Sequence, residues 1–328
     1  MNRNDIPAIG IDLGGTKILA GLVANSRLVG EPIKIATPVG PDNIIKAILE
    51  LIAGFQKSHL VLGVGIATAG IVDPESGAIL GSTGNLPGWE GTALKHVIQD
   101  KTALRTHVEN DANAAAYGEC RAAGLHTSTC AVMVTLGTGI GGGIMLNGSL
   151  YRGAHFAGGE VGHIKISMEN QRRCTCGLWD CWEAYGSGRG LLATAIEMSK
   201  GKSAEQSILC AGNSELTTKD VLEAAAAGDL IAKNALQKYH EHISAGISAL
   251  CHVLDPDCFV ISGGMSKFVD LHLLKDLVAD RTLPRIAEKL QIFPSRLSEA
   301  AGMIGAAQIV LDAVASLESV GSAAGKSS

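Results

Sequence analysis

The first part of the chain consists of two apolar runs separated by a short glycine turn. Ala8–Leu13 and Lys17–Ala24 are apolar at nearly every position, and Gly14 and Gly15 lie between them. Two apolar runs joined by a glycine turn are typical of a β-hairpin. The chain is therefore expected to begin with two paired strands.

Further along, the spacing of the apolar positions changes between that of a helix and that of a strand. Residues 44–55 have helical spacing, residues 60–67 and 106–109 are typical of buried strands, and residues 111–123 predict another helix. Strands that alternate with helices indicate α/β layering.

The glycine-turn pattern occurs a second time in the middle of the chain. Residues 131–136 predict a strand, 137–143 a glycine turn and 143–146 a returning strand. An internal repeat of this kind indicates two related lobes. We expect an N-terminal lobe over residues 1–124 and a C-terminal lobe over residues 125–318.

Several elements are expected in the last third of the chain. Residues 229–253 predict one long helix that ends before an Asp-Pro pair, and residues 258–262 predict a strand. A closing helix is expected at about residues 300–315, with the option of packing back on the N-terminal lobe. The remaining segment, 319–328, is rich in Ser, Gly and Ala and is expected to be a disordered tail.

The composition is that of an ordinary globular protein. With 328 residues, 46% of them hydrophobic and 18% charged, the chain is long enough for two lobes with separate cores. The net charge is −5, and Lys and Arg form no block. Partners such as nucleic acid or an anionic membrane are therefore not expected.

Further features bear on the compartment of the protein. Residues 122–151 contain no Asp, Glu, Lys or Arg, but glycines interrupt them, so buried strands and a turn are expected rather than a membrane span. The first predicted strand begins near Ala8, which leaves no room for a signal peptide. Eight cysteines are too sparse for a disulfide scaffold. We expect a cytoplasmic protein.

Glycine turns follow three of the predicted strands, and each could bring backbone N–H groups close to an anion. The turns lie at residues 14–17, 137–143 and 263–264. None is a Walker A sequence, and strand-like residues rather than a helix follow the second turn, which argues against a dinucleotide-binding fold. A single glycine hairpin is more often structural, but three such turns suit one nucleotide.

Five ordered motifs closely resemble those of the ROK family of sugar kinases and related repressors, within the superfamily of actin, hexokinase and Hsp70. The resemblance extends over roughly residues 8–315. Its motifs are DLGGTK at 12–17, ENDANAAAYGE at 109–119, GTGIGGG at 137–143, GGEVGH at 158–163 and CTCGLWDCWE at 174–183. Asp180 and Trp182 depart from the family pattern, in which Gly and Leu are common at these positions.

The resemblance implies an α/β fold of two actin-like, ribonuclease H-like lobes with a cleft between them, the fold of the ASKHA superfamily. It also implies an ATP-dependent hexose kinase of carbohydrate metabolism. The first expectation is a glucokinase of glycolysis, which converts glucose and ATP into glucose 6-phosphate and ADP. A kinase for N-acetylmannosamine or N-acetylglucosamine is the alternative, because the same polar residues would hold the shared ring hydroxyls. A phosphate donor other than ATP also stays open.

Other functions within the superfamily agree less well with the sequence. A sugar-responsive regulator of the ROK family normally has an additional N-terminal helix-turn-helix domain, and a first strand near Ala8 leaves no place for one. The sugar and metal motifs argue against a chaperone or a filament protein. We expect a small-molecule sugar and a nucleotide as partners, and a homodimer or a homotetramer as the assembly.

By the same resemblance, Asp111 is the catalytic residue that accepts the proton of the sugar hydroxyl. Taken alone, Asp111 could also be an ordinary N-cap of the predicted helix, as could Asn110, and Asn85 could be a turn residue. The resemblance assigns the following residues to the sugar: Gly70, Asn85, Asn110, Asp111, Glu160, His163 and Glu183.

The residues expected at the nucleotide follow the three glycine turns. Asp12 resembles the family's acidic residue near the phosphates and Mg²⁺, where it would act through water because Mg²⁺ keeps much of its hydration. Thr138 would touch the transferred phosphoryl group. The expected ATP-binding residues are Asp12, Gly14, Gly15, Thr16, Lys17, Gly137, Thr138, Gly139, Gly263 and Gly264.

Three of the eight cysteines fall within eight positions, which suggests a metal rather than disulfide bridges. They are Cys174, Cys176 and Cys181, and His163 lies eleven residues before the first of them. Three thiolates and one imidazole are the usual closed set for structural Zn²⁺. We expect a zinc ion that shapes the site without taking part in the chemistry. Plain buried or surface thiols are the alternative.

Overall fold

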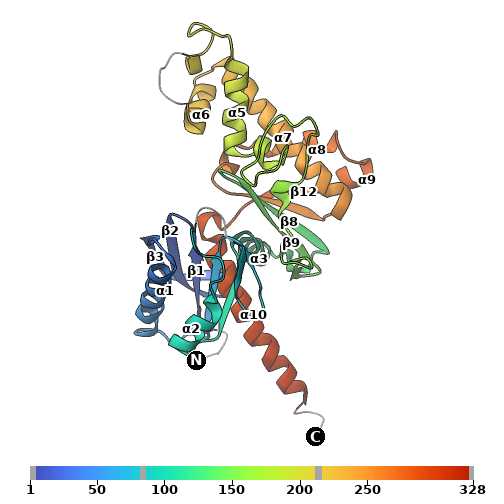
Figure 1. The fold of residues 1–328 in the computed structure, drawn as a ribbon. Coiled ribbons are helices and arrows are strands. Elements are labelled where there is room, and N and C mark those ends of the chain that lie inside the picture. Colours follow the sequence, from blue (N-terminus) through green and yellow to red (C-terminus); the bar gives the residue numbers. More distant parts are fainter. Residues whose placement is uncertain (1–4, 82–85, 211–215, 325–328) are drawn as a thin grey trace. The chain divides into compact units, whose positions relative to one another are not determined.

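The computed structural model describes residues 5–81, 86–210 and 216–324 and divides the chain into two compact units (Figure 1). The first unit comprises Met1–Ser128, Gly143–Gly159 and Arg296–Ser328, and the second comprises Thr129–Gly142 and Glu160–Ser295. The closing helix belongs to the first unit, in agreement with the option that it packs back on the N-terminal lobe, whereas the segment Gly143–Gly159 was expected in the C-terminal lobe and also belongs to the first unit. Contacts between distant segments decide the grouping, and the local sequence pattern does not contain them.

The sheet of the first unit mixes antiparallel and parallel strands. Its spatial order is β3 (Arg27–Ala36), β2 (Lys17–Ala24), β1 (Ala8–Leu13), β4 (Val64–Thr68) and β7 (Thr106–Asn110). β2 pairs antiparallel with both β1 and β3, and β4 pairs parallel with both β1 and β7. The carboxyl ends of β1, β4 and β7 therefore lie at the same edge of the sheet. The expected hairpin is confirmed as β1 and β2.

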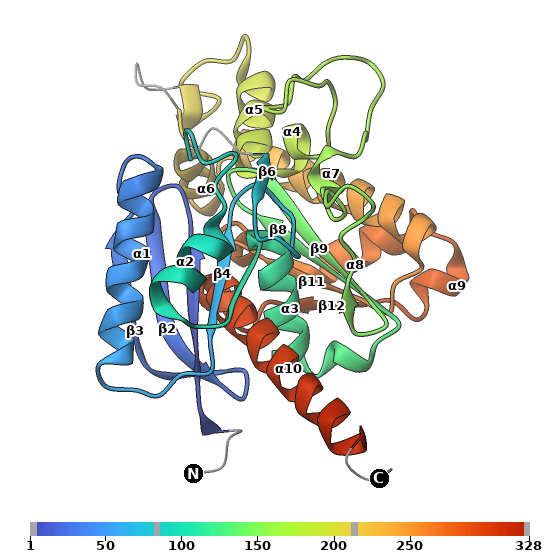
Figure 2. The same cartoon turned by 60° about the horizontal axis from the view of Figure 1, so that its bottom comes forward.

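Helices cover both faces of this sheet (Figure 2). The helices are α1 (Pro41–Gln56), α2 (Leu94–Thr102), α3 (Asp111–Ala123) and α10 (Ala301–Ala324), and a small ribbon of β5 (Ile71–Val72) and β6 (Ile79–Gly81) follows β4. Successive side chains of a strand point to opposite faces. Ile9 and Ile11 therefore share one face and form a core with Ile48 and Ile52 of α1.

The opposite face carries α10 and α3, which lie side by side (Figure 2). Gly10 of β1 and Gly65 of β4 are paired neighbours in the sheet. A Cβ atom on Gly10 would overlap the Met303 carbonyl oxygen, and one on Gly65 would overlap that of Ala306. The two strands need glycine here because the backbone of α10 lies directly on the sheet.

α10 is the core helix of the first unit. By length and composition, Ser298–Leu317 could also cross a membrane, but half of that window is buried within the protein. There Met303, Ile304 and Ala307 pack with residues of β1 and β2. Residues 319–324, expected in a disordered tail, form the end of α10 instead, because each added residue extends an existing helix without a new nucleation cost. Residues 325–328 lie outside the described residues.

The second sheet repeats the pattern of the first. Its order is β10 (Ser149–Leu150), β9 (Ile140–Leu146), β8 (Cys130–Leu136), β11 (Cys258–Ser262) and β12 (Gln291–Pro294). β10 pairs antiparallel with β9, whereas β11 pairs parallel with both β8 and β12. The chain passes from the second unit into the first within β9, at Gly143. The shared strand order agrees with the repeated glycine turns of the sequence.

The second unit carries the remaining helices. They are α4 (Glu183–Gly186), α5 (Gly188–Ser199), α6 (Thr218–Ala226), α7 (Leu230–Leu254), α8 (Leu271–Ala279) and α9 (Pro284–Ala287). α7 packs against α4, α5, α6 and α8, so it is the central helix of this unit. Its bounds agree closely with the predicted helix over 229–253, and the α/β class is confirmed in both units.

Candidate active site

Asn110 ends β7 and is the N-cap of α3. Its Oδ1 accepts a hydrogen bond from the Asn113 N–H at 3.0 Å, and its Nδ2 donates to the Gly70 carbonyl oxygen at 3.0 Å. Because Asn110 is the cap, Asp111 is the first residue of the helix, and the alternative in which Asp111 is the cap is wrong. The structure thus brings Gly70 and Asn110, both expected at the sugar, into direct contact.

Asp12 and Asp111 form an acidic pair in the first unit. The pKa of Asp12 is raised to about 7, first by burial and then by the charge of Asp111, while Lys17 lowers it. Burial also raises the pKa of Asp111, although the Ala112 N–H donates to its Oδ1 at 2.8 Å. A carboxylate whose pKa is raised towards neutral pH is a stronger base, as proton removal from a hydroxyl requires.

The glycine turn between β1 and β2 follows Asp12 of this pair in the sequence. The Gly14 N–H donates to the Lys17 carbonyl oxygen at 3.0 Å, which closes the turn. Gly15 and Thr16 are exposed, and the Lys17 ammonium is ion-paired with Glu299. The positive charge expected at the phosphates is therefore already paired, and the exposed backbone of the turn is the part suited to contact an anion.

In the second unit, Glu183 and Arg189 hold the glycine turn after β8. Glu183 Oε2 accepts a hydrogen bond from the Ile140 N–H at 3.0 Å, and Arg189 Nε donates to the Thr138 carbonyl oxygen at 3.0 Å. Arg189 Nη2 also lies 3.2 Å from Glu183 Oε1. A Cβ atom on Gly139 would overlap Glu183 Oε2. Glu183, expected at the sugar, thus contacts the expected phosphate turn in this structure.

The glycine pair after β11 lies beside the beginning of the same turn. Gly263 has a φ of 89°, and a Cβ atom on it would overlap the carbonyl oxygen of Leu136, the last residue of β8. The Met265 N–H donates to that oxygen at 2.9 Å. Gly264 has no other atom within 4 Å of where its Cβ would be. The second unit therefore brings together two of the three expected phosphate turns.

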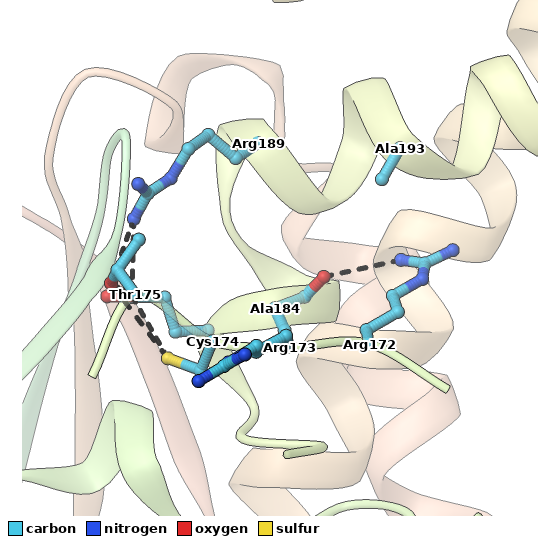
Figure 3. A pocket seen from close by; sticks show the side chains of 8 residues that line it. Arg172, Arg173, Cys174, Thr175, Ala184, Arg189 and Ala193 are labelled. Atoms are coloured by element: carbon cyan, nitrogen blue, oxygen red, sulfur yellow. Dashed lines mark hydrogen bonds and ion pairs between the residues drawn. The ribbon is translucent and has the colours of Figure 1, made fainter. Parts of the chain in front are cut away.

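A cavity of about 280 Å³ opens beside Glu183 (Figure 3). It is lined by Arg172, Arg173, Cys174, Thr175, Glu183, Ala184, Arg189 and Ala193. In Figure 3, Arg189 reaches towards Thr175, which also donates from Oγ1 to Glu183 Oε1 at 2.8 Å. Cys174 lies at the wall of this cavity, so the cavity adjoins the group of thiols expected to bind a metal.

The four expected metal ligands converge on one point. The ligand atoms of His163, Cys174, Cys176 and Cys181 all lie within 4.8 Å of one another. The Cys176 and Cys181 sulfurs are 3.7 Å apart, as are His163 Nδ1 and Cys174 Sγ. In a tetrahedron with Zn–S bonds of about 2.3 Å, two sulfurs are about 3.8 Å apart, whereas a disulfide requires about 2.05 Å. The geometry of the four residues fits zinc.

Asp180 holds the loop that carries these thiols. Its φ of 56° suits glycine, the residue common here in the ROK family, and Asp is among the few other residues that tolerate it. Its carboxylate accepts hydrogen bonds from the N–H groups of Asn170, Gln171 and Arg172 at 2.6 to 3.1 Å. The Tyr185 hydroxyl donates to it at 2.6 Å. Asp180 therefore adds side-chain hydrogen bonds to the loop that a glycine at this position could not make.

Trp182, the second departure from the family pattern, is fully buried against α7. Its Nε1 donates to the His242 carbonyl oxygen at 2.8 Å, and a Cβ atom on Gly246 would overlap its ring. Gly246 thus makes room for a side chain larger than Leu. Trp182 fixes the end of the thiol loop to the central helix of its unit.

Of the other residues expected at the sugar, Glu160 lies beside His163. The distance between Glu160 Oε2 and His163 Nε2 is 3.8 Å, while Nδ1 of the same ring faces the thiols. A carboxylate next to the second nitrogen of a metal-bound imidazole commonly orients the ring. Asn85 lies outside the described residues.

Two side chains that organise these sites, Arg152 and Arg189, were not predicted from the sequence. Arg152 forms an ion pair with Glu109, which stands immediately before Asn110. A weak signal existed, because Arg152 is the first charged residue after the uncharged residues 122–151. Arg189 carried no signal, since its partners Thr138 and Glu183 are fixed by the fold.

This chain is similar in sequence to known kinases and repressors. The sequence profile of the ROK family matches residues 8–313. A glucokinase of Streptomyces coelicolor is 32% identical over 312 residues, which cover 92% of this chain and 96% of the relative. A xylose repressor of Caldicellulosiruptor bescii is 29% identical and is covered to 79% of its length, with 95% of this chain aligned.

The crystal structure of a ROK family glucokinase from Streptomyces griseus, in complex with glucose and AMPPNP, is also similar to this chain. The two share 33% identity and a TM-score of 0.73, with 92% of this chain and 98% of that chain covered. A ROK hexokinase from Thermus thermophilus has a TM-score of 0.75 at 28% identity, with 92% and 97% covered. Both similarities extend across the two units.

Proposed function

Because the chain belongs to the ROK family, whose fold is the actin-like α/β fold, we propose that it is an ATP-dependent hexose kinase that converts glucose into glucose 6-phosphate. The glucokinase relative supports this proposal, since it is 32% identical to this chain over 312 residues and 96% of its length is covered. The bound glucose and AMPPNP of the Streptomyces griseus enzyme support glucose and ATP as the substrates.

The observation that carries the proposal is the Asp111 carboxylate at the start of α3. Because Asn110 is the N-cap, Asp111 is not needed to cap the helix. Its raised pKa fits a base that accepts the proton of a sugar hydroxyl. Phosphoryl transfer otherwise depends mainly on positioning and on the stabilisation of charge. In the proposed reaction, Asn110 and Gly70 orient the sugar hydroxyl towards Asp111.

The nucleotide is assigned to the glycine turns. The exposed Gly15 and Thr16, together with the turn at Thr138, would donate backbone N–H groups to the phosphates. The pKa of Asp12 is raised to about 7, mainly by burial, and a nearby cation would favour its charged form, which would suit a water-mediated contact to Mg²⁺. When bound, Mg²⁺ would neutralise part of the negative charge of the phosphates.

The thiol cluster is assigned to a structural zinc ion. His163, Cys174, Cys176 and Cys181 provide four protein ligands, which leaves no coordination position for water or substrate. The ion would therefore shape the segment between Glu160 and Glu183 without joining the reaction. Glu160 then orients the imidazole from its outer side, and it faces the sugar with its remaining hydrogen-bonding capacity.

The proposal is tested by a coupled ADP-release assay with glucose, mannose, N-acetylglucosamine and N-acetylmannosamine. We expect ATP-dependent phosphorylation with the highest kcat/KM for glucose. A preference for an N-acetylated sugar would support the kinase activity but would show that the substrate is an N-acetylhexosamine and not glucose. A parallel series with inorganic polyphosphate as the donor tests ATP. No phosphorylation of any sugar, combined with sugar binding by calorimetry, would contradict the kinase and favour a regulator.

A further inference from the structure

A buried ion pair adjoins the expected catalytic segment. The Glu109 side chain is 1% exposed, and its Oε2 accepts hydrogen bonds from Arg152 Nε at 2.9 Å and Nη2 at 2.7 Å. Its Oε1 accepts one from the Asn110 N–H at 3.1 Å and one from Asn113 Nδ2 at 3.3 Å. One carboxylate therefore binds the end of β7, the first turn of α3 and Arg152 at the same time.

The Glu109 carboxylate is held as an anion. Burial by itself raises the pKa of Glu109, but the neighbouring His107, whose Nε2 lies 3.5 Å from Oε2, and the charge of Arg152 bring it below its ordinary value. Removing two charges from water is costly, and apolar residues of similar volume are often equally stabilising. The ion pair instead fixes the orientation of the groups around it, because their donors must converge on the two carboxylate oxygens of Glu109.

On the other side of the pair, Arg152 begins a tightly closed loop. The Gly158 N–H donates to the Arg152 carbonyl oxygen at 2.7 Å, and a Cβ atom on Gly158 would lie 2.6 Å from the Arg152 carbonyl carbon. Gly153 has a φ of 72°, which favours glycine. The loop over residues 152–158 therefore folds back on its first residue, whose side chain fixes it to β7.

The two asparagines extend this connection to Asp111. Asn113 donates from its N–H to Asn110 Oδ1 and from its Nδ2 to Glu109 Oε1. Glu109 and Asn110 thus hold the same residue of the first helical turn, and Asp111 lies within that turn. If Glu109 moves, the start of α3 and the carboxylate of Asp111 must move with it.

Starting from the proposed kinase function, we propose that Glu109 and Arg152 are positioning residues. Their ion pair fixes the first turn of α3, and with it Asn110 and Asp111, to the loop over 152–158. Neither side chain needs to touch the sugar or the nucleotide. Phosphoryl transfer should be sensitive to this pair because a displacement of about 1 Å at a catalytic group can cost about 10²-fold in rate.

The test uses Glu109→Gln, Arg152→Gln and the double variant of the full chain. Gln keeps the size and one acceptor of Glu109 but removes the charge that Arg152 binds. We expect kcat/KM for glucose to fall by about 10-fold or more in each single variant. Since the two residues act as a unit, the double variant should lose little more than the worse single variant. Arg152→Lys, which keeps the charge, should recover part of the loss.

Arg121→Gln is the matched control. Arg121 lies near the other end of α3 and makes the same kind of pair, with Nε 2.8 Å from Asp312 Oδ2 of α10. The Arg121 and Arg152 side chains are similarly exposed, 27% and 26%. The control should lower the melting temperature as the test variants do but leave kcat/KM within about twofold, because distant sites act independently.

Hydrogen exchange of the amides of residues 110–113 separates this inference from the proposed function. We expect faster exchange there in the Glu109 and Arg152 variants and no change in the control. If the wild-type protein phosphorylates no sugar, the kinase proposal fails, and the exchange result alone decides whether the pair positions α3. If kcat/KM and exchange change no more than in Arg121→Gln, the pair is merely structural and the inference is overturned.

Discussion

The two sheets share a strand order, but the turns at corresponding places in them carry different chemistry. In the first unit, the turn after β1 follows Asp12, and the acidic pair with Asp111 has raised pKa values. In the second unit, the corresponding turn after β8 contains no acidic residue. Glu183, which lies later in the chain, accepts a hydrogen bond from the Ile140 N–H of this turn. The repeated sheet thus determines where each glycine turn lies. The segments inserted around each turn determine which side chains contact it.

The units also differ in what holds their candidate sites together. The start of α3 is fixed by hydrogen bonds among Glu109, Asn110 and Asn113. Among the described residues of the thiol loop, strand-like pairing is limited to the isolated bridges Lys165↔Cys181 and Arg173↔Trp179. Ligand bonds to a metal would supply what this loop lacks in backbone pairing. The first site is therefore expected to survive metal removal, and the second is not.

Substitution of Asp111 should produce the largest effect. Asp111→Asn removes the proposed base while keeping the size of the side chain, so kcat should fall by about 10² or more and the glucose dissociation constant should change little. Asp100→Asn, an exposed acid in α2, is the control. Turnover of Asp111→Asn within about threefold of the wild type would exclude Asp111 from the mechanism.

Loss of a thiol ligand should come next in size. Wild-type protein should contain one zinc ion per chain by elemental analysis, and Cys176→Ser should lose it together with about 10-fold or more in kcat/KM for glucose. Cys210→Ser, outside the cluster, should keep both the zinc and the activity. A metal-free wild-type preparation with full activity would contradict the site and its structural role.

A smaller effect is expected at the second glycine turn. Gly139→Ala places a methyl group on Glu183 Oε2, which must move away from the Ile140 N–H. Because the change displaces the turn rather than removing a catalytic group, the KM for ATP should rise by about 10-fold. Gly54→Ala, where a Cβ atom has no neighbour within 4 Å, is the control. An unchanged KM for ATP would show that Glu183 does not position the turn.

The smallest effect concerns stability and pH in the first unit. Asp12 has a pKa of about 7 in the folded protein against the ordinary aspartate pKa of 3.8, so the folded state holds a proton that the unfolded state releases between these values. The stability contribution is complete below about pH 4 and is lost as the pH rises through 7. Urea unfolding without nucleotide or Mg²⁺ should show this decline, and Asp12→Asn should reduce it to the part that comes from the raised pKa of Asp111. An equal decline in the variant would contradict the assignment.

Local patterns predicted those parts of the fold that depend on neighbouring residues. The bounds of β1, β2 and β11 and of α3 agree with the sequence because apolar periodicity and glycine turns are local signals. β3 was missed because it is an edge strand with many exposed residues and little alternation. The assignment of segment 143–159 to the first unit depends on tertiary contacts and could not be predicted from local patterns.

The candidate sites were predictable to a similar extent. The motifs identified the acids, the glycine turns and the four metal ligands, and the structure brings those four ligands together. The partners of Glu109 and Glu183 could not be predicted, because Arg152 and Ile140 are each 43 residues away along the chain. The family pattern also could not indicate how Asp180 replaces glycine, since its four hydrogen bonds depend on the folded loop.

The pH dependence of kcat/KM for glucose, measured in the wild type and in Asp111→Asn, tests the central claim most directly. The profile of kcat/KM reports the ionisation of the free enzyme. The wild type should lose activity on the acidic side above the ordinary aspartate pKa of 3.8, because burial raises the pKa of both Asp12 and Asp111. In Asp111→Asn the remaining activity should decline at lower pH, since Asp12 loses its charged neighbour. Identical acidic limbs in the two proteins would contradict the claim that Asp111 is the base and is coupled to Asp12.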